Sequence, residues 1–146
     1  MGVFAKVPLI VDTSALTRWR QASDQTRGKL RLALERQELC TTTVVRLEFL
    51  HDAFDRSVFD VRERMFGVYR RDIALDTADG AVALQAMRDL AAYEPPQSPY
   101  RKVKAGDALI AAAAVREGVG VLHYDHDYER LGLVFPALVQ VAVEPF

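Results

Sequence analysis

The chain has 146 residues, of which 50% are hydrophobic and 27% are charged, and its formal net charge at pH 7 is −1. This size suits a single domain over residues 1–146 with one core, and the near-zero net charge does not by itself indicate nucleic-acid binding. No apolar run approaches the ~20 residues of a membrane span, and the first residues lack a secretory signal, so we expect a cytoplasmic protein without a membrane partner.

Short apolar runs that are typical of buried strands alternate with helical patterns along the chain. We expect strands near residues 7–11, 39–42, 72–75, 119–124 and 138–143. The segment 94–99 is a clear loop between two of the helices, because it contains three prolines. Strands that alternate with helices imply right-handed crossovers, so we predict an α/β fold with a mainly parallel sheet of about five strands, flanked by helices.

Acidic residues occur where apolar segments would otherwise continue. Asp12 directly follows the first predicted strand, and either Thr13 or Ser14 is in position to cap the helix that comes next. Glu48 belongs to the helical pattern of residues 43–54 and shares a face with two valines of that helix. We therefore expect the Glu48 carboxylate to point inward.

Two further aspartates repeat this arrangement. Asp107 opens a helix of mostly small apolar residues, and Asp125 follows the strand predicted at residues 119–124. Because ligands bind beyond the carboxyl ends of parallel strands, Asp12 and Asp125 are expected to converge at one edge of the sheet. A buried carboxylate costs several kcal/mol unless a cation or hydrogen-bond donors compensate it, so four of them in a short chain predict a metal site.

The ligand chemistry narrows the choice of ion. Oxygen ligands with few imidazoles favour Mg²⁺ or Mn²⁺ over zinc. We expect Asp12 and Asp107 to be direct ligands, and Glu48 and Asp125 to act either directly or through a bound water. A zinc site that includes His123 is disfavoured, because the neighbouring His126 is expected to face solvent.

Four blocks of sequence in this order resemble the PIN-domain family and, within it, the VapC-type toxins of bacterial toxin–antitoxin pairs. The blocks are residues 10–16, 45–48, 106–114 and 121–128. The resemblance implies a metal-dependent endoribonuclease that hydrolyses RNA with Mg²⁺ or Mn²⁺. It implies that the catalytic and metal-binding residues are Asp12, Glu48, Asp107 and Asp125, with Ser14 and Asp127 in supporting roles.

The resemblance also implies partners, namely an RNA substrate, a cognate antitoxin protein and a second copy of the chain in a homodimer. Arg101 and Lys104 lie just before Asp107, and they are candidates either for contacts with an RNA phosphate or for ordinary loop charges. Many relatives have a threonine where this chain has His123, which leaves the hydrogen bonding around Asp125 to be determined.

Other functions stay open at this point. Within the family, the chain could be a housekeeping RNA-processing nuclease. In a different class, it could be a non-enzymatic binding module whose acidic cleft receives an arginine from a partner. A phosphatase or receiver domain is disfavoured, because it would need a nucleophilic aspartate with a partner lysine, and the phosphatase pattern needs an aspartate where Ser14 stands.

The helical segments 43–54 and 58–69 carry more large apolar side chains than one buried stripe needs. Phe49, Phe54, Phe59 and Phe66 are among them. They either form a groove that receives an amphipathic helix of an antitoxin or simply fill the core.

Overall fold

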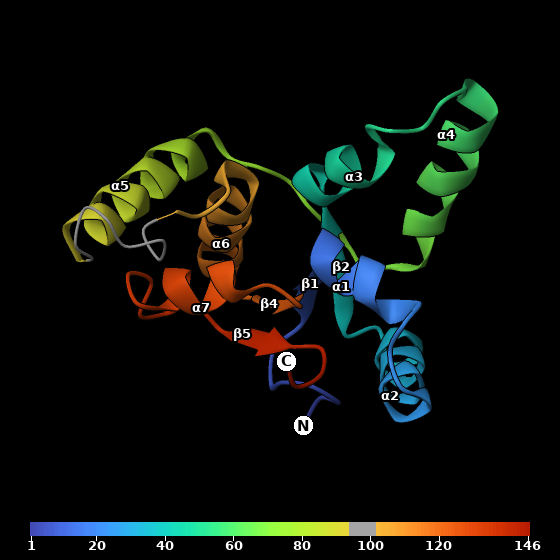
Figure 1. Ribbon diagram of the computed structural model, residues 1–146. Coiled ribbons are helices and arrows are strands. Elements are labelled where there is room, and N and C mark those ends of the chain that lie inside the picture. Colours follow the sequence, from blue (N-terminus) through green and yellow to red (C-terminus); the bar gives the residue numbers. More distant parts are fainter. Residues whose placement is uncertain (94–101) are drawn as a thin grey trace.

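The protein is described by a computed structural model that covers residues 1–93 and 102–146 (Figure 1). The predicted loop at residues 94–99 and Arg101 lie outside the described residues. The strands are β1 (Leu9–Val11), β2 (Leu39–Thr42), β3 (Asp72–Ile73), β4 (Gly120–His123) and β5 (Gln140–Ala142). The helices are α1 (Thr13–Trp19), α2 (Asp24–Glu35), α3 (Thr43–Leu50), α4 (Arg56–Arg64), the 3₁₀ helix η1 (Met65–Val68), α5 (Thr77–Tyr93), α6 (Ala105–Glu117) and α7 (His126–Gly132).

The five strands form one sheet in the order β3-β2-β1-β4-β5, and every neighbouring pair is parallel. The α/β prediction is therefore confirmed, and most of the strands are shorter than their predicted ranges. Strand β1 pairs with β2 on one side, where Leu9 is opposite Leu39, and with β4 on the other, where Leu9 is opposite Gly120. Because the strand order runs outward in both directions from β1, the carboxyl end of β1 is the switch point at which α/β sheets bind ligands.

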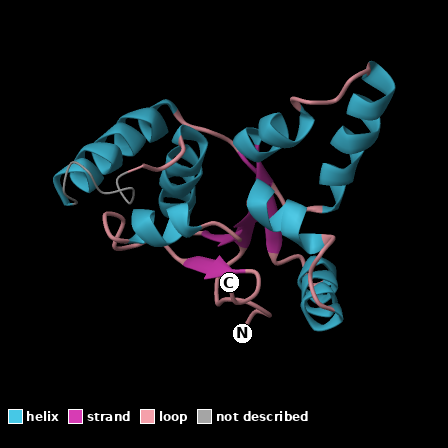
Figure 2. Ribbon diagram, viewed as in Figure 1, coloured by secondary structure: helices cyan, strands magenta, loops and turns pink. Residues whose placement is uncertain are grey.

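Helices cover both faces of the sheet (Figures 1 and 2). Because side chains alternate along a strand, Ile10 and Val121 pack on the face covered by α5, α6 and α7. Leu9 and Leu122 belong to a second cluster, which includes residues of α1 and α2 on the opposite face. Among the described residues, no helix is both long and apolar enough to cross a membrane.

Helix α6, which carries Asp107, is held against α5 by an ion pair between Arg116 and the buried Asp79. The Arg116 guanidinium donates to both oxygens of Asp79, with Nε–Oδ1 at 2.9 Å and Nη2–Oδ2 at 3.0 Å. Asp79 is buried, and the hydrogen bond from Arg116 lowers the pKa of its carboxyl group. This two-point contact fixes the rotation of α6 and hence the direction of the Asp107 side chain.

The region that was predicted as a helix over residues 43–54 is shorter in the structure. Helix α3 ends at Leu50, and Asp55 begins the next helix by accepting a hydrogen bond from the Val58 N–H at 2.8 Å. Phe54 therefore lies between the two helices and is 83% exposed. Helix α4 stands away from the sheet (Figure 1), and none of its residues is buried.

Candidate metal centre

A cleft of about 500 Å³ opens at the carboxyl edge of the sheet beside β1 and β4. All four acidic residues that the sequence singled out line it, namely Asp12, Glu48, Asp107 and Asp125. They come from four separate places in the fold: the end of β1, helix α3, the first turn of α6 and the end of β4. The predicted convergence of Asp12 and Asp125 is thus seen in the structure.

Asp12 is almost fully buried and is itself the N-cap of α1, because its Oδ2 accepts the Ser14 N–H at 3.0 Å. The prediction that Thr13 or Ser14 would cap this helix was wrong. The extended backbone of the residue that ends β1 suits an N-cap, and its carboxylate is an equally good acceptor. Ser14 instead donates its hydroxyl to Asp12 Oδ2 and accepts the Tyr124 N–H at 2.9 Å. Ser14 therefore ties Asp12 to the end of β4.

Sequence analysis missed Tyr128, which lies at the centre of the carboxylates. Its side chain is fully buried, and its hydroxyl is 2.8 Å from Asp12 Oδ1 and 3.4 Å from Asp107 Oδ1. Burial and the nearby charges of Asp12 and Asp107 raise the pKa of Tyr128 well above its usual value, so the hydroxyl stays a donor. Its position one helical turn after Asp125, on the buried side of α7, was the available signal.

Asp107 is the carboxylate with the least compensation. It is 2% exposed, and its Oδ2 atom is buried with no hydrogen-bond partner in the part of the chain that the structure describes. Burial, followed by the negative charges of Asp12 and Asp125, raises the pKa of Asp107 to about 8. The Lys104 ammonium offsets this shift only in part, so an ionised Asp107 needs a further positive charge in the cleft, and an oxygen-binding cation fits this need.

Glu48 is positioned by a threonine and a glycine. Its Oε2 atom accepts the Thr13 hydroxyl at 2.7 Å, a contact that the sequence did not reveal. A Cβ atom at Gly106 would lie only 2.4 Å from Glu48 Oε1, so the absence of a side chain at Gly106 lets α3 bring this carboxylate close to the start of α6. Glu48 is half-buried and faces the cleft.

Lys104 forms an ion pair with Asp125 inside the cleft, with Nζ and Oδ2 separated by 2.7 Å. Burial acts to raise the pKa of Asp125, but the bonds from the Lys104 ammonium and the Asp127 N–H outweigh it, so the pKa lies below its usual value. Since 70% of the Lys104 side chain is exposed, this pair contributes little to stability. The ammonium can therefore leave Asp125 at a small energetic cost.

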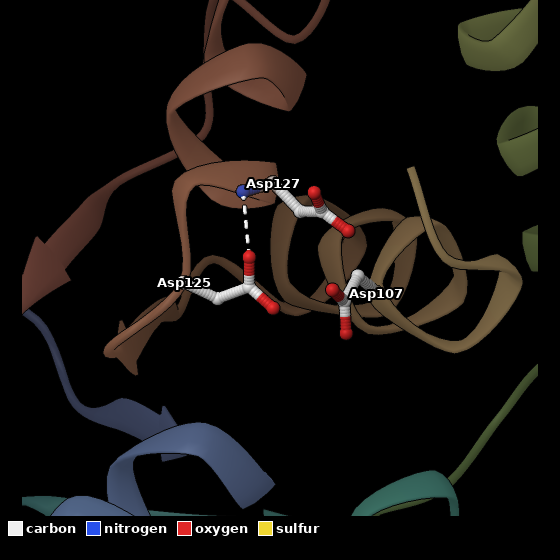
Figure 3. Close-up of side chains that lie close together, drawn as sticks. All are labelled: Asp107, Asp125 and Asp127. Atoms are coloured by element: carbon white, nitrogen blue, oxygen red, sulfur yellow. Dashed lines mark hydrogen bonds between the residues drawn. The ribbon is translucent and has the colours of Figure 1, made fainter. Parts of the chain in front are cut away.

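Asp127 lies close to the other carboxylates, and Figure 3 shows it beside Asp107 and Asp125. Each of these three residues has a carboxylate oxygen within 4.8 Å of the other two. Both oxygens of Asp127 are nevertheless occupied, because Oδ1 accepts from Arg130 at 2.7 Å and Oδ2 accepts the Lys104 N–H at 3.0 Å. Lys104 is the N-cap of α6, so Asp127 holds the start of that helix in place.

His123 is the residue for which the sequence left the hydrogen bonding around Asp125 to be determined. It is fully buried, and its two ring nitrogens contact Gln140 Oε1 at 2.5 Å and the Asp125 N–H at 3.1 Å. Burial lowers the pKa of His123, so the ring is neutral, with Nδ1 as the acceptor. Because both nitrogens are engaged, His123 orients the Asp125 backbone rather than binding a metal. His126 is exposed, as predicted.

Comparisons with known proteins agree with this arrangement. The family model for the PIN domain matches residues 9–133. Ribonuclease VapC21 of Mycobacterium tuberculosis is 32% identical over 138 residues, which are 93% of this chain and 94% of that protein. Ribonuclease VapC18 of the same species is 32% identical over 126 residues, which are 85% of this chain and 87% of that protein.

Solved structures share the fold at lower identity. The DNA-bound VapBC structure from Salmonella typhimurium has a TM-score of 0.66 at 17% identity and covers 94% of this chain and 99% of that one. VapBC2 from Rickettsia felis, bound to a DNA fragment from its promoter, has a TM-score of 0.69 at 13% identity and covers 93% of this chain and 98% of that one. The chain therefore belongs to the PIN-domain family and, within it, to the VapC-type ribonucleases.

Proposed function

We propose that this protein is the endoribonuclease toxin of a toxin–antitoxin pair and that it hydrolyses RNA with Mg²⁺ or Mn²⁺ held by Asp12, Glu48, Asp107 and Asp125. One observation carries the proposal. The buried Asp107 carboxylate keeps one oxygen without a hydrogen bond to any described residue, although it lies among other acidic groups. A buried carboxylate of this kind is stable in its ionised form only beside a cation or another positive group, and otherwise it takes up a proton.

The ion would supply a Lewis acid and lower the pKa of a water molecule, which is the chemistry that phosphodiester hydrolysis needs. The protein orients the carboxylates that hold the ion. Tyr128 and Ser14 fix the Asp12 oxygens, and Thr13 fixes Glu48. Lys104 pairs with Asp125, and its ammonium would be in position to bind the substrate phosphate if a bound ion neutralised that carboxylate.

Purified protein is expected to cleave single-stranded RNA when Mg²⁺ or Mn²⁺ is present and to stop when a chelator removes the ion. Separation of the fragments by electrophoresis measures this. A binding module with an acidic cleft would bind RNA or a basic peptide without cutting RNA, whatever the ion. A housekeeping nuclease would cleave, but brief induction of it would not arrest growth, whereas a toxin arrests growth unless its antitoxin is present.

A second surface bears on the antitoxin partner. An apolar pocket of about 260 Å³ lies between α1, α2, α3 and η1. Its lining comprises Leu16, Trp19, Arg20, Leu34, Phe49, Met65, Phe66, Val68 and Tyr69. Of the four phenylalanines that could either form a groove or fill the core, Phe49 and Phe66 line this pocket, and Phe54 and Phe59 do not. Phe66 is buried and contacts Phe49 edge to face, so it also belongs to the core.

We propose that this apolar pocket receives side chains of an antitoxin helix. Solved relatives such as VapBC-5 from Mycobacterium tuberculosis are described as members of a family of toxin–antitoxin systems. Met65 lines the pocket and is 52% exposed, so a partner can cover it without unfolding the toxin. The pocket lies beside a polar cleft that includes Glu48, and Arg20 and Phe49 line both, so a partner seated there can reach the carboxylates.

Met65→Glu is expected to weaken the binding of the cognate antitoxin at least tenfold, because the partner would bury an uncompensated charge. Val61→Glu is the matched control, since Val61 is also 52% exposed but lies on α4 outside the pocket. Titration calorimetry measures both affinities, and RNA cleavage should be unchanged in both variants. Equal affinity of the two variants would move the antitoxin interface elsewhere.

A further inference from the structure

Three aromatic rings stack together beside the candidate metal centre. The Phe146 ring lies 4.7 Å from the Tyr124 ring and 4.1 Å from the His126 ring, measured between centroids, and each pair is within 25° of parallel. Tyr124 and His126 flank Asp125 in the sequence. Asp125, whose carboxylate lines the cleft, therefore lies between two residues whose rings both stack on Phe146.

The backbone explains why the rings face one way and the carboxylate another. Asp125 has an extended conformation, with φ −149° and ψ 129°. In an extended segment, side chains two residues apart lie on the same side, so Tyr124 and His126 both face Phe146 while Asp125 points away from them. The spacing between the rings and the carboxylate is therefore set by one stretch of backbone.

The stack is fixed to the rest of the site. The Tyr124 N–H donates to Ser14 Oγ, and Ser14 in turn donates to Asp12. The Arg18 guanidinium lies over the Tyr124 ring, with its Cζ atom 4.8 Å from the ring centroid. Arg18 is itself held by Glu144, with Nε–Oε1 at 2.5 Å. Both Arg18 and Tyr124 line the same cleft as the carboxylates.

The rings are also accessible. Phe146 is 51% exposed, and 57% of the His126 side chain is exposed. A stack that served only to fill the core would bury these rings. Exposed aromatic rings next to an arginine are surfaces on which proteins bind unpaired bases of single-stranded nucleic acid.

Building on the proposed ribonuclease function, we propose that Phe146, together with Tyr124 and His126, forms a platform on which one unpaired base of the RNA stacks next to the scissile phosphate. Arg18 extends this aromatic platform along the cleft. The platform holds the substrate and does not take part in the chemistry. Its loss should therefore raise KM more than it lowers kcat.

The test uses a single-stranded RNA of about ten nucleotides, within the usual range of such sites, and a set of copies that each lack one base. With the wild-type protein, removal of one particular base should weaken binding at least fivefold. Phe146→Leu should weaken binding of the intact RNA to a similar extent, and removal of that base should then have little further effect, as a double-mutant cycle requires. Phe146→Trp should restore the wild-type behaviour.

Phe59→Leu is the matched control, because Phe59 is 38% exposed on α4 and is not one of the stacked rings. Should Phe146→Leu fail to fold, the series of base deletions on the wild type still decides, since no sensitive position means no platform. If folded Phe146→Leu has an unchanged KM, the inference is overturned. The same holds if this variant loses affinity for the antitoxin but keeps its affinity for RNA. Absence of RNA cleavage by the wild type instead overturns the proposed function, and the inference with it.

Discussion

Asp107→Asn is expected to lower the rate of RNA cleavage at least tenfold, which corresponds to ~1.4 kcal/mol of activation free energy. Asparagine keeps the shape of the side chain but removes the charge that the proposed ion requires. The protein should stay folded, because the substitution also removes a buried charge that lies close to Asp12 and Asp125. Cleavage of a fluorescent RNA at saturating Mn²⁺ measures the effect.

Two other variants test whether the loss of cleavage is specific to Asp107. Asp60→Asn changes an exposed aspartate of α4 that pairs only loosely with Arg56, and it should leave cleavage unchanged. Asp127→Asn should have a milder effect than Asp107→Asn, because both Asp127 oxygens already serve protein donors. Full activity of Asp107→Asn would remove the proposed mechanism.

The main features of the site followed from the sequence because they depend on backbone geometry alone. A residue directly after a buried parallel strand must lie at the carboxyl edge of the sheet, and this rule placed Asp12 and Asp125. Asp107 was identifiable because it begins a helix of small residues that has to pack closely on its neighbours. Ala108, Ala111 and Ala112 are indeed buried.

The hydrogen bonds around the carboxylates could not be predicted in the same way. The Tyr128 hydroxyl reaches Asp12 because α7 packs at a particular depth on the sheet, and that depth is set by many contacts at once. The bond from Thr13 to Glu48 joins residues 35 positions apart, and Gly106 leaves room for the Glu48 carboxylate that accepts it. Asp127 was given a supporting role from the sequence, but the sequence could not show that its oxygens accept from Arg130 and from the Lys104 N–H.

The positions of the phenylalanines around the apolar pocket could not be predicted from the sequence either. The composition of segments 43–54 and 58–69 indicated surplus phenylalanines, but it could not distinguish buried from exposed ones. Asp55 was a usable signal, since an aspartate between two helical patterns is a common N-cap. Which rings line the pocket depends on Trp19 and Leu34, which approach from the other side of the fold and are distant in sequence.

In the presence of a chelator, the free energy of unfolding is expected to fall as the pH rises from about 4 toward 8, with a contribution from Asp107 of at most ~1.4 kcal/mol per pH unit. The pKa of Asp107 is about 8 in the folded protein, against an ordinary value of 3.8. Within this window the folded protein keeps a proton that the unfolded chain has released. The contribution of Asp107 to stability is therefore fully present below the unfolded pKa and is lost as the pH approaches the folded one.

His123 acts in the opposite direction, because burial lowers its pKa, so its contribution to stability increases as the pH rises toward the ordinary value of 6.5 and is constant above it. This contribution is common to the wild type and Asp107→Asn, so the difference between their denaturant unfolding curves isolates Asp107. The difference should widen with pH in chelator, whereas Asp60→Asn should follow the wild type.

Millimolar Mg²⁺ or Mn²⁺ binds the ionised form of Asp107, so its stabilising effect on the wild type should grow over the same pH window. Parallel curves for the wild type and Asp107→Asn would mean that Asp107 is ionised without a cation, and the main physical reason for a metal at this position would be lost.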